Sequence, residues 1–388
     1  MCEAILFLTG LAGLKFNNFR QAGGGAVIQK ERLDIFHEMS LRNRLVKTQF
    51  QLTRRCNLRC IHCKVNHNKT TEEISVDDIK KLLPELKKTG CFHLNLTGGE
   101  FLMRPDIYEM LEVFFSFDFI YSFQTNATLI DSEVVSFFAA NRKKIRTFAI
   151  SLYAASPEIH DSITGVRGSH ERTLDAIKRL MENDLYAAAF CTMMEQNYAD
   201  AADLLRLCES LGVECRFGTV ISPGEGRDYA PLRLRLTEEG LANLSLPLDK
   251  LIAMDSHFYP ALFAPDKPIA GWCTMGQSSC YIEAGGEVYP CSLVEKSAGN
   301  IKRMSFVDIW RNSPVFKEIR DYRVRDFECS RCEHIGDCIP CPGLAYAEQG
   351  NMFEAPREGC RIMKFVLRGG VRSEKALHQA ATDSVRDD

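Results

Sequence analysis

The sequence has almost no excess of charge of either sign. It contains 48 Lys and Arg residues against 51 Asp and Glu residues, so its formal net charge is −3. Proteins that bind nucleic acid or anionic membranes through a basic surface carry a clear positive excess. We therefore expect no nucleic-acid partner and no membrane partner for this protein.

Long apolar runs are also missing. The apolar stretch at residues 4–14 is flanked by Glu3 and Lys15, and it is far shorter than the roughly 20 residues that span a bilayer. A secretory signal has basic residues before its apolar segment and a small-residue cleavage site after it. We expect residues 4–14 to form a buried element or an edge strand, and we expect a cytoplasmic protein.

Cysteine, by contrast, is abundant, with 16 residues in the chain. Because the cytosol keeps thiols reduced, we do not expect a disulfide framework without a secretion signal. Ligation of a metal or of iron–sulfur clusters is the main remaining explanation. Eleven cysteines fall into spaced groups, and the other five stand singly among apolar neighbours, where small core residues are expected. These five are Cys2, Cys91, Cys191, Cys208 and Cys215.

From residue 48 onward, strand-like apolar runs alternate with helical patterns. The predicted strands cover residues 48–52, 92–96, 119–124, 147–152, 187–192 and 214–220. The first predicted helix begins after Ser75 and ends at Gly90. The others cover residues 105–115, 132–140, 170–181 and 201–211. Six strands that alternate with helices indicate an α/β fold with a parallel sheet, which is an open barrel if the sheet is curved.

The alternation stops near Pro223. Residues 223–231 are rich in glycine and charge, and residues 232–268 have partly helical character. From Gly271 onward cysteines are frequent, and Gly285-Gly286 predicts a hairpin turn between residues 281–282 and 288–289. We therefore predict an N-terminal extension (1–46), a core domain (47–222), a linker (223–270), a small cysteine-held domain (271–365) and a tail (366–388) that is disordered after Arg372.

The first cysteine group, Cys56, Cys60 and Cys63, directly follows the first predicted strand. In such folds ligand sites form at the carboxyl ends of the strands. Thiolates suit zinc or an iron–sulfur cluster, and structural zinc needs four ligands, whereas a cubane with three thiolates leaves one iron open. The zinc interpretation requires His62 or His67 as a fourth ligand, and it remains open here.

The C-x3-C-x2-C spacing of this group resembles the motif of the radical S-adenosylmethionine (SAM) superfamily. The motif Gly98-Gly99-Glu100, which follows the second strand, is similar to the Gly-Gly-Glu motif of that superfamily, although Phe101 replaces its usual proline. The resemblance implies a [4Fe–4S] cluster that binds SAM. Glycines let a backbone approach a ligand, and a carboxylate accepts bonds from an α-ammonium group.

Two further positions match SAM-contacting residues of the family. Ser151 lies at the end of the fourth strand, and Arg172, early in the predicted helix over 170–181, matches an arginine that reaches the SAM carboxylate. Asn126, at the end of the third strand, lines the same pocket in this interpretation. We therefore expect Gly98, Gly99, Glu100, Asn126, Ser151 and Arg172 to bind SAM.

The second cysteine group contains eight residues, enough for two four-iron clusters. They are Cys273, Cys280, Cys291, Cys329, Cys332, Cys338, Cys341 and Cys360. The pattern resembles the SPASM domain, although two residues rather than three separate Cys338 from Cys341. The resemblance implies one auxiliary cluster on Cys273, Cys280, Cys291 and Cys341, and an outer one on Cys329, Cys332, Cys338 and Cys360. A pair of zinc knuckles is the alternative.

The two resemblances together imply a partial (β/α)6 radical SAM barrel, followed by a small cysteine-rich SPASM domain that holds auxiliary iron–sulfur clusters. They imply an oxidoreductase that cleaves SAM to a 5′-deoxyadenosyl radical and modifies a peptide or protein. Residues 163–169 look most like maturases of ribosomal peptides. Ser292 follows Cys291 where the sulfatase-maturating branch has an aspartate, so that branch is set aside.

Two other functions remain to be weighed. One is a tetrapyrrole side-chain maturase of the same architecture, and the other is a zinc-held binding module without catalytic activity. For the peptide maturase we expect a reductant protein of the flavodoxin or ferredoxin type. Because only about 46 residues precede the barrel, leader recognition is expected to fall to a separate protein.

Overall fold

The computed structural model describes residues 38–67, 69, 71–244, 246, 265–269, 273–335, 338 and 340–368. The expectations for Cys2, for residues 4–14 and for the tail beyond residue 368 lie outside these residues. The same holds for most of the second half of the predicted linker.

The six predicted strands form one parallel sheet. They are β1 (Lys47–Gln51), β2 (His93–Thr97), β3 (Ile120–Thr125), β4 (Ile145–Ser151), β5 (Ala187–Thr192) and β6 (Glu214–Gly218). Consecutive strands are neighbours in the sheet, and every neighbouring pair is parallel. The predicted α/β fold with a partial barrel is therefore confirmed.

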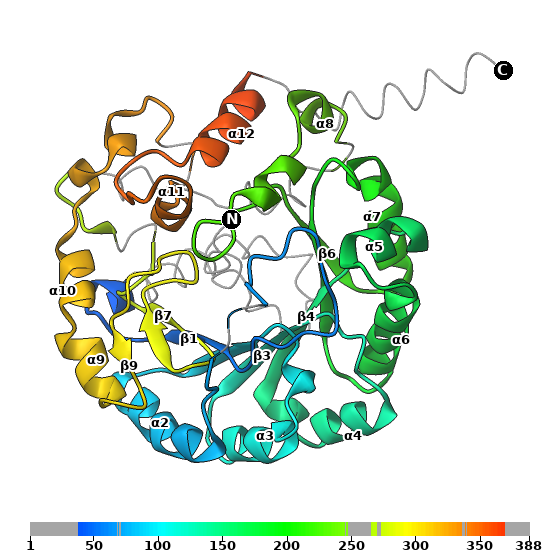
Figure 1. Ribbon diagram of the computed structural model, residues 1–388, viewed down its shortest axis with the longest axis horizontal. Coiled ribbons are helices and arrows are strands. Elements are labelled where there is room, and N and C mark those ends of the chain that lie inside the picture. Colours follow the sequence, from blue (N-terminus) through cyan, green and yellow to red (C-terminus); the bar gives the residue numbers. More distant parts are fainter. Residues whose placement is uncertain are drawn as a thin grey trace, which may run out of the picture.

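Helices cover the outer face of this sheet, as Figure 1 shows. They are α2 (Val76–Thr89), α3 (Ile107–Phe115), α4 (Ser132–Ala140), α5 (Pro157–Thr164), α6 (Ser169–Glu182) and α7 (Ala201–Ser210). A core of large apolar side chains fills the space between helices and strands. Phe123 is fully buried there, with its ring stacked on Phe148 at a centroid distance of 5.1 Å.

The first of these helices shows how local sequence sets its ends. Ser75 accepts a hydrogen bond from the amide of Asp78, while the Asp78 carboxylate accepts one from the amide of Ser75. This reciprocal pair satisfies amide groups that would otherwise have no partner in the first turn. At the other end Gly90 adopts a left-handed conformation with φ of 100°, which glycine tolerates best.

Helix α5 was not among the predicted helices. Ser156 caps this helix by accepting from the amide of Ile159, Pro157 occupies its first turn, and Gly165 ends it with φ of 71°. These are ordinary helix boundary signals. The helix is only two turns long, so its apolar periodicity is too short to stand out.

The predicted hairpin is present, and it joins the barrel sheet. Strands β7 (Ser279–Ile282) and β8 (Glu287–Tyr289) pair antiparallel around Gly286, which has φ of 92°. Strand β7 also pairs in parallel with β1, and the short β9 (Gly299–Asn300) pairs with β8. The result is one sheet of nine strands in the order β6-β5-β4-β3-β2-β1-β7-β8-β9.

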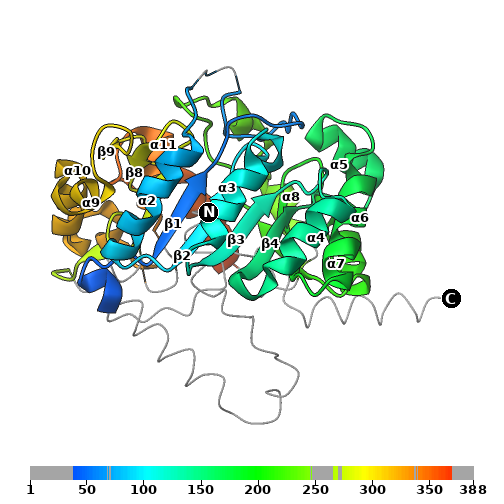
Figure 2. The ribbon, with the colours of Figure 1, turned by 90° about the horizontal axis from the view of Figure 1, so that it is seen from below.

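The region after the hairpin is helical. It contains α9 (Phe306–Asn312), α10 (Pro314–Asp321), α11 (Pro342–Gln349) and α12 (Arg357–Leu367), while α8 (Glu238–Ala242) lies in the predicted linker. Figure 2 shows α9 and α10 beside α2, at one side of the barrel strands. A second, smaller apolar core lies in this region, separate from the core of the barrel.

None of the helices among the described residues is both long enough and apolar enough to cross a lipid bilayer.

Candidate functional site

The loop that carries the first cysteine group starts at the carboxyl end of β1 and packs against the Gly98-Gly99 turn. The amide of Gly99 donates to the carbonyl of Thr53 at 2.8 Å, and the amide of Glu100 donates to that of Arg55 at 2.7 Å. A Cβ atom on Gly99 would lie 2.7 Å from the carbonyl oxygen of Arg54. Here the glycine permits close approach of the cysteine loop itself, whereas the sequence analysis had assigned this role to a ligand.

Glu100 is completely buried and tied to the next strand. Its carboxylate accepts from the hydroxyl of Thr125 at 2.8 Å and from the amide of Asn126 at 2.9 Å. Burial raises the pKa of Glu100 to about 7, against the effect of these hydrogen bonds. The structure thus gives this carboxylate a positioning role at the ends of β2 and β3, while its predicted contact with SAM stays a prediction.

Asn126 connects this turn to the cysteine loop. Its side-chain nitrogen lies 3.0 Å from Oδ1 of Asn57 and 3.8 Å from the sulfur of Cys56. Its carbonyl oxygen accepts from the hydroxyl of Thr173 on α6 at 2.9 Å. Asn126 therefore belongs to the surroundings of the first cysteine group.

The three cysteines of this group lie close enough together to affect one another. Burial raises the pKa of Cys56 to about 11 and that of Cys60 to about 12, and the negative charge of neighbouring thiolates adds to both shifts. The amide of Leu58 donates to the sulfur of Cys56 at 3.4 Å. Thiols with such raised pKa values stay protonated on their own. They become thiolates when a cation binds them, as iron does in a cluster.

The two histidines of the loop differ in their surroundings. The ring of His62 packs edge-on against Tyr153 at 4.8 Å, and burial lowers the pKa of His62 to about 4. His67 lies with Nε2 3.6 Å from the sulfur of Cys63 and Nδ1 3.3 Å from the carbonyl oxygen of Arg54. His62 is therefore a neutral packing residue, and His67 is a hydrogen-bonding neighbour of a cysteine.

The donor set fits a cluster better than a single zinc ion. Among the described residues, no group of three or more Cys, His, Asp or Glu side chains is arranged to hold one metal ion. A tetrahedral zinc site requires such convergence on one point. In a cubane each thiolate binds a different iron, so its ligands stay further apart.

Two other predicted SAM contacts lie in different settings. Ser151 lies at the carboxyl end of β4, and its hydroxyl interacts with the phenol of Tyr153. Arg172 lies on the exposed side of α6, close to Gly168. Its guanidinium forms no ion pair within the described part of the chain, so its role toward SAM stays a prediction.

Arg54 is a functional residue that sequence reasoning missed. It lies two positions before Cys56 and is only 5% exposed. Its guanidinium donates to Glu283 on the turn after β7 at 3.0 Å and forms an ion pair with Glu225. It also donates to the carbonyl of Asn66 at 3.1 Å. A single buried cation thus ties the cysteine loop to the hairpin and to the 224–228 turn.

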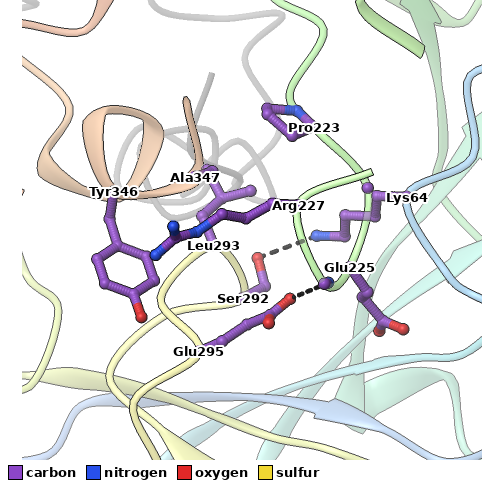
Figure 3. Close-up of a pocket in the computed structure, with 11 residues that line it drawn as sticks. Lys64, Pro223, Glu225, Arg227, Ser292, Leu293, Glu295, Tyr346 and Ala347 are labelled. Atoms are coloured by element: carbon purple, nitrogen blue, oxygen red, sulfur yellow. Dashed lines mark hydrogen bonds between the residues drawn. The ribbon is translucent and has the colours of Figure 1, made fainter. Parts of the chain in front are cut away.

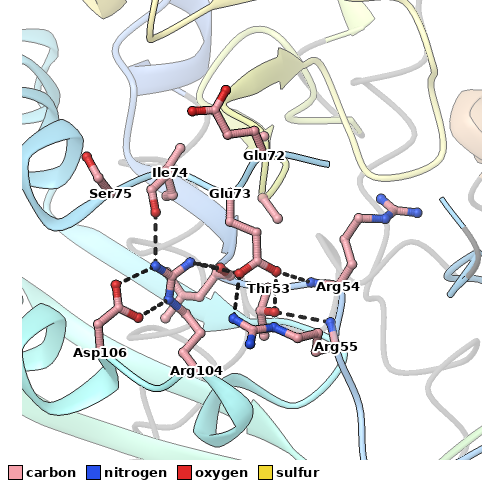
Figure 4. A network of polar contacts seen from close by, with 12 residues as sticks. Thr53, Arg54, Arg55, Glu72, Glu73, Ile74, Ser75, Arg104 and Asp106 are labelled. Carbon is pink, nitrogen blue, oxygen red and sulfur yellow. Dashed lines mark hydrogen bonds and ion pairs between the residues drawn. The ribbon is translucent and has the colours of Figure 1, made fainter. Parts of the chain in front are cut away.

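A second ionic network supports the start of the same loop (Figure 4). Glu73 accepts from the hydroxyl of Thr53, from the amide of Arg54 at 3.2 Å and from Arg55 at 2.9 Å. The neighbouring Arg104 donates to the carbonyl of Leu52 at 2.7 Å and lies 3.4 Å from Glu73. These contacts fix the backbone between β1 and the first cysteine.

The second cysteine group divides into two sets and one exception. One set surrounds Cys329. Burial raises the pKa of Cys329, and the charges of Cys332, Cys338 and Cys360 add to that effect, which indicates that the four lie near one another. Burial raises the pKa of Cys273, and the charges of Cys341 and Cys291 add to that effect, so these three also lie together. The role of both sets as cluster ligands stays a prediction.

Cys280 is the exception, and here the structure differs from the prediction. Its sulfur lies 3.7 Å from the hydroxyl of Thr48 on β1, within the barrel core. It lies on β7, where side chains alternate between the two faces of the sheet. The charges that act on it come from Cys91 and Arg320, and not from Cys273, Cys291 or Cys341.

A pocket of about 360 Å³ opens between the two cysteine regions (Figure 3). Lys64, directly after Cys63, donates to the hydroxyl of Ser292, directly after Cys291, at 3.0 Å. The 224–228 turn forms another wall, where the amide of Gly226 donates to Glu295 at 2.9 Å. Tyr346 and Ala347 on α11 complete the lining. The pocket therefore adjoins both sites.

Family models match two parts of the chain. Residues 50–228 match the radical SAM superfamily, and residues 273–333 match the SPASM iron–sulfur cluster-binding domain.

Individual relatives span most of the chain. An AdoMet-dependent heme synthase from Methanosarcina barkeri is 27% identical over 338 residues, which is 79% of this chain and 93% of the relative. Mycofactocin maturase MftC from Mycobacterium tuberculosis is 27% identical over 300 residues, 74% of this chain and 76% of the relative. Among solved structures, Streptococcus suis SuiB bound to its precursor peptide SuiA has a TM-score of 0.64 at 17% identity, covering 89% of this chain and 83% of that one.

The partial barrel, the three-cysteine loop at its strand ends and the following cysteine-held region agree with these matches. The chain belongs to the radical SAM superfamily and is an enzyme with a SPASM iron–sulfur domain.

Proposed function

We propose that this enzyme cleaves SAM reductively and modifies a peptide substrate, as maturases of ribosomal peptides do. When bound to Cys56, Cys60 and Cys63, a [4Fe–4S] cluster supplies the electron that splits SAM into methionine and a 5′-deoxyadenosyl radical, which takes a hydrogen atom from a substrate carbon. The cysteines of the SPASM domain would hold auxiliary [4Fe–4S] clusters, which would take up the electron that the product radical loses or anchor the substrate.

The protein's own residues position these parts. The Gly98-Gly99 turn and Glu100 hold the ends of β2 and β3 against the cysteine loop through the bonds described above. Arg54 fixes that loop to the hairpin. We propose that Gly98, Gly99, Glu100, Asn126, Ser151 and Arg172 surround SAM, so that the reacting atoms are kept from water.

The lining of the pocket between the two cysteine regions is the observation that favours a peptide over a tetrapyrrole as the substrate. This lining combines charged and hydroxyl groups with apolar surface. The charged and hydroxyl side chains are Lys64, Glu225, Arg227, Ser292 and Glu295, and they lie beside Pro223, Leu293, Tyr346 and Ala347. A peptide segment offers amide donors, carbonyl acceptors and charges to such walls. A flat tetrapyrrole macrocycle is better matched by an apolar slot.

The tetrapyrrole side-chain maturase is the second candidate, because heme synthases are among the relatives and one is covered over 93% of its length. The two functions are separated by substrate-dependent turnover. Reconstituted enzyme with SAM and dithionite is given either short cysteine-rich peptides encoded beside its gene or a propionate-bearing tetrapyrrole. We expect only a peptide to change mass and to stimulate 5′-deoxyadenosine formation. Turnover with the tetrapyrrole alone would overturn the peptide assignment.

Two partners belong to this proposal. A reductant protein of the flavodoxin or ferredoxin type delivers the electron, and a separate leader-binding protein presents the peptide. We place the reaction in the cytoplasm, where thiols remain reduced and available to bind iron.

Arg227 provides a test of the pocket. It is exposed, lies 5.8 Å from the Tyr346 ring and forms no ion pair within the described residues. We expect Arg227→Gln to raise the KM for an acidic peptide roughly two- to fivefold at low salt, which corresponds to a loss of about 0.4–1 kcal/mol. SAM cleavage without peptide should not change.

Arg233→Gln is the matched control, since Arg233 is also an exposed arginine of this region but does not line the pocket. We expect its KM to equal that of the wild type. Because Arg227 lies beside Gly350 at the end of α11, the melting temperatures of both variants must be compared. An unchanged KM in Arg227→Gln shows that the substrate does not use this wall.

A further inference from the structure

Of the four cysteines predicted to hold the inner auxiliary cluster (Cys273, Cys280, Cys291 and Cys341), only Cys280 lies on a strand of the sheet, β7. Cys280 and Ile282 belong to the core between β7 and the helices, with Trp310 and Phe316 of α9 and α10. On the opposite face, the ring of Tyr281 lies 6.3 Å from that of Tyr289. Because side chains alternate along a strand, Cys280 can turn to the other face only if the register of β7 changes.

That register is fixed by pairing with the barrel. Thr48 of β1 lies opposite Cys280, and Phe50 lies opposite Ile282. A shift by one residue would expose Ile282, which is now fully buried, and would move Tyr281 into the core. The pairing with β1 therefore keeps Cys280 in the barrel core, whereas Cys291 and Cys341 belong to the second apolar core and Cys273 packs against it.

The hydrogen bonds to the sulfur atoms show the same division. The amide of Leu293 donates to Cys291 at 3.4 Å, and the amide of Leu344 donates to Cys341 at 3.4 Å. The amide of Met275 bonds in the same way to Cys273. These contacts repeat the bond from Leu58 to Cys56 in the first cysteine group, and amide bonds to sulfur are one means by which proteins tune iron–sulfur clusters.

Cys280 has a different partner. The amide two residues further on belongs to Ile282, which lies in the paired part of β7. The sulfur of Cys280 instead lies 3.7 Å from the Thr48 hydroxyl, and Thr48 also lies 3.5 Å from the sulfur of Cys91. Cys91 is one of the cysteines expected to be ordinary core residues, and Cys280 shares its environment.

We propose that Cys280 is a core residue, and that the inner auxiliary cluster is held by only Cys273, Cys291 and Cys341. Since a cubane with three protein thiolates has one iron without such a ligand, the fourth position is available to an external ligand. The neighbouring pocket gives access, because Ser292 and Leu293 after Cys291 line it, as do Tyr346 and Ala347 on the helix that begins behind Cys341. The proposal does not depend on which substrate the enzyme takes.

The test uses protein reconstituted under anaerobic conditions, with iron content and EPR of the reduced clusters as readouts. To isolate the auxiliary signals, Cys280→Ala, Cys341→Ala and Cys91→Ala are each made in a background in which Cys56, Cys60 and Cys63 are alanine. We expect Cys280→Ala and Cys91→Ala to keep the roughly eight irons of the background, with its spectrum unchanged. We expect Cys341→Ala to lose up to about four irons.

Cyanide, a small anion that binds an open iron, tests the second part. We expect cyanide to change the EPR spectrum of one auxiliary cluster in the reduced background protein. The same change is expected when Cys280→Ala is added to that background. If Cys280→Ala loses iron as Cys341→Ala does while Cys91→Ala does not, Cys280 is a ligand and the proposal is wrong. A spectrum that does not respond to cyanide would show that another group fills the fourth position.

Discussion

Replacing Cys56, Cys60 and Cys63 together by alanine is expected to abolish SAM cleavage while leaving about eight irons bound in the auxiliary clusters. The three thiols form one group at the strand ends, whereas Cys273, Cys291 and Cys341 of the second group lie in or against a separate apolar core. The measurement is dithionite-driven formation of 5′-deoxyadenosine together with iron analysis. We expect the product to fall to the background of the assay.

The matched control replaces three buried cysteines outside both groups, Cys91, Cys191 and Cys208. This variant should bind as much iron as the wild type and still cleave SAM. Persistence of 5′-deoxyadenosine in the first variant would place the chemistry at another site in the protein.

The second large effect is expected on stability, from Arg54→Met. This change removes the cation that pairs with both Glu225 and Glu283, so the two carboxylates lose their shared partner. Glu283 is only 5% exposed, so water cannot replace that partner. Breaking a buried ion pair by removing one partner typically costs about 3–5 kcal/mol. We expect a loss of this order in the free energy of unfolding, measured by anaerobic denaturation of the cluster-loaded protein.

Arg55→Met is the control next to it in the chain. Arg55 also pairs with a carboxylate, Glu73 at 2.9 Å, but its side chain is 50% exposed. Exposed pairs contribute about 0–1 kcal/mol, so this variant should unfold close to the wild type. Equal midpoints for the two variants would mean that Arg54 does not hold the cysteine loop to the hairpin.

The barrel could be predicted because its strands and helices have regular apolar patterns within short stretches of sequence. The helix over 132–140 and the strand over 187–192 were predicted with the bounds that the structure gives. The short α5 lacked enough turns for such a pattern. The pairing of β7 with β1 was out of reach, since it joins residues more than 200 positions apart and leaves no local trace.

The parts of the candidate site that are formed by residues close together in the sequence could be predicted. The spacing of Cys56, Cys60 and Cys63 and the Gly98-Gly99 turn stand in the sequence itself. Arg54 was missed because its carboxylate partners come from two distant segments.

Spacing alone groups Cys280 with Cys273, Cys291 and Cys341, because spacing cannot say which face of a sheet a side chain takes. The predicted strand at 281–282 did contain a signal. Alternation along it places Cys280 on the side of Ile282, an apolar residue, and away from Tyr281. Strand periodicity is therefore a useful check on ligands that are assigned by spacing.

Metal analysis and SAM cleavage by the reconstituted wild-type protein test the central claim most directly. With three plus eight cysteines in two groups, we predict roughly twelve irons with matching sulfide, and formation of 5′-deoxyadenosine when SAM and dithionite are added. A stable preparation that carries zinc in place of iron and leaves SAM intact would contradict this account.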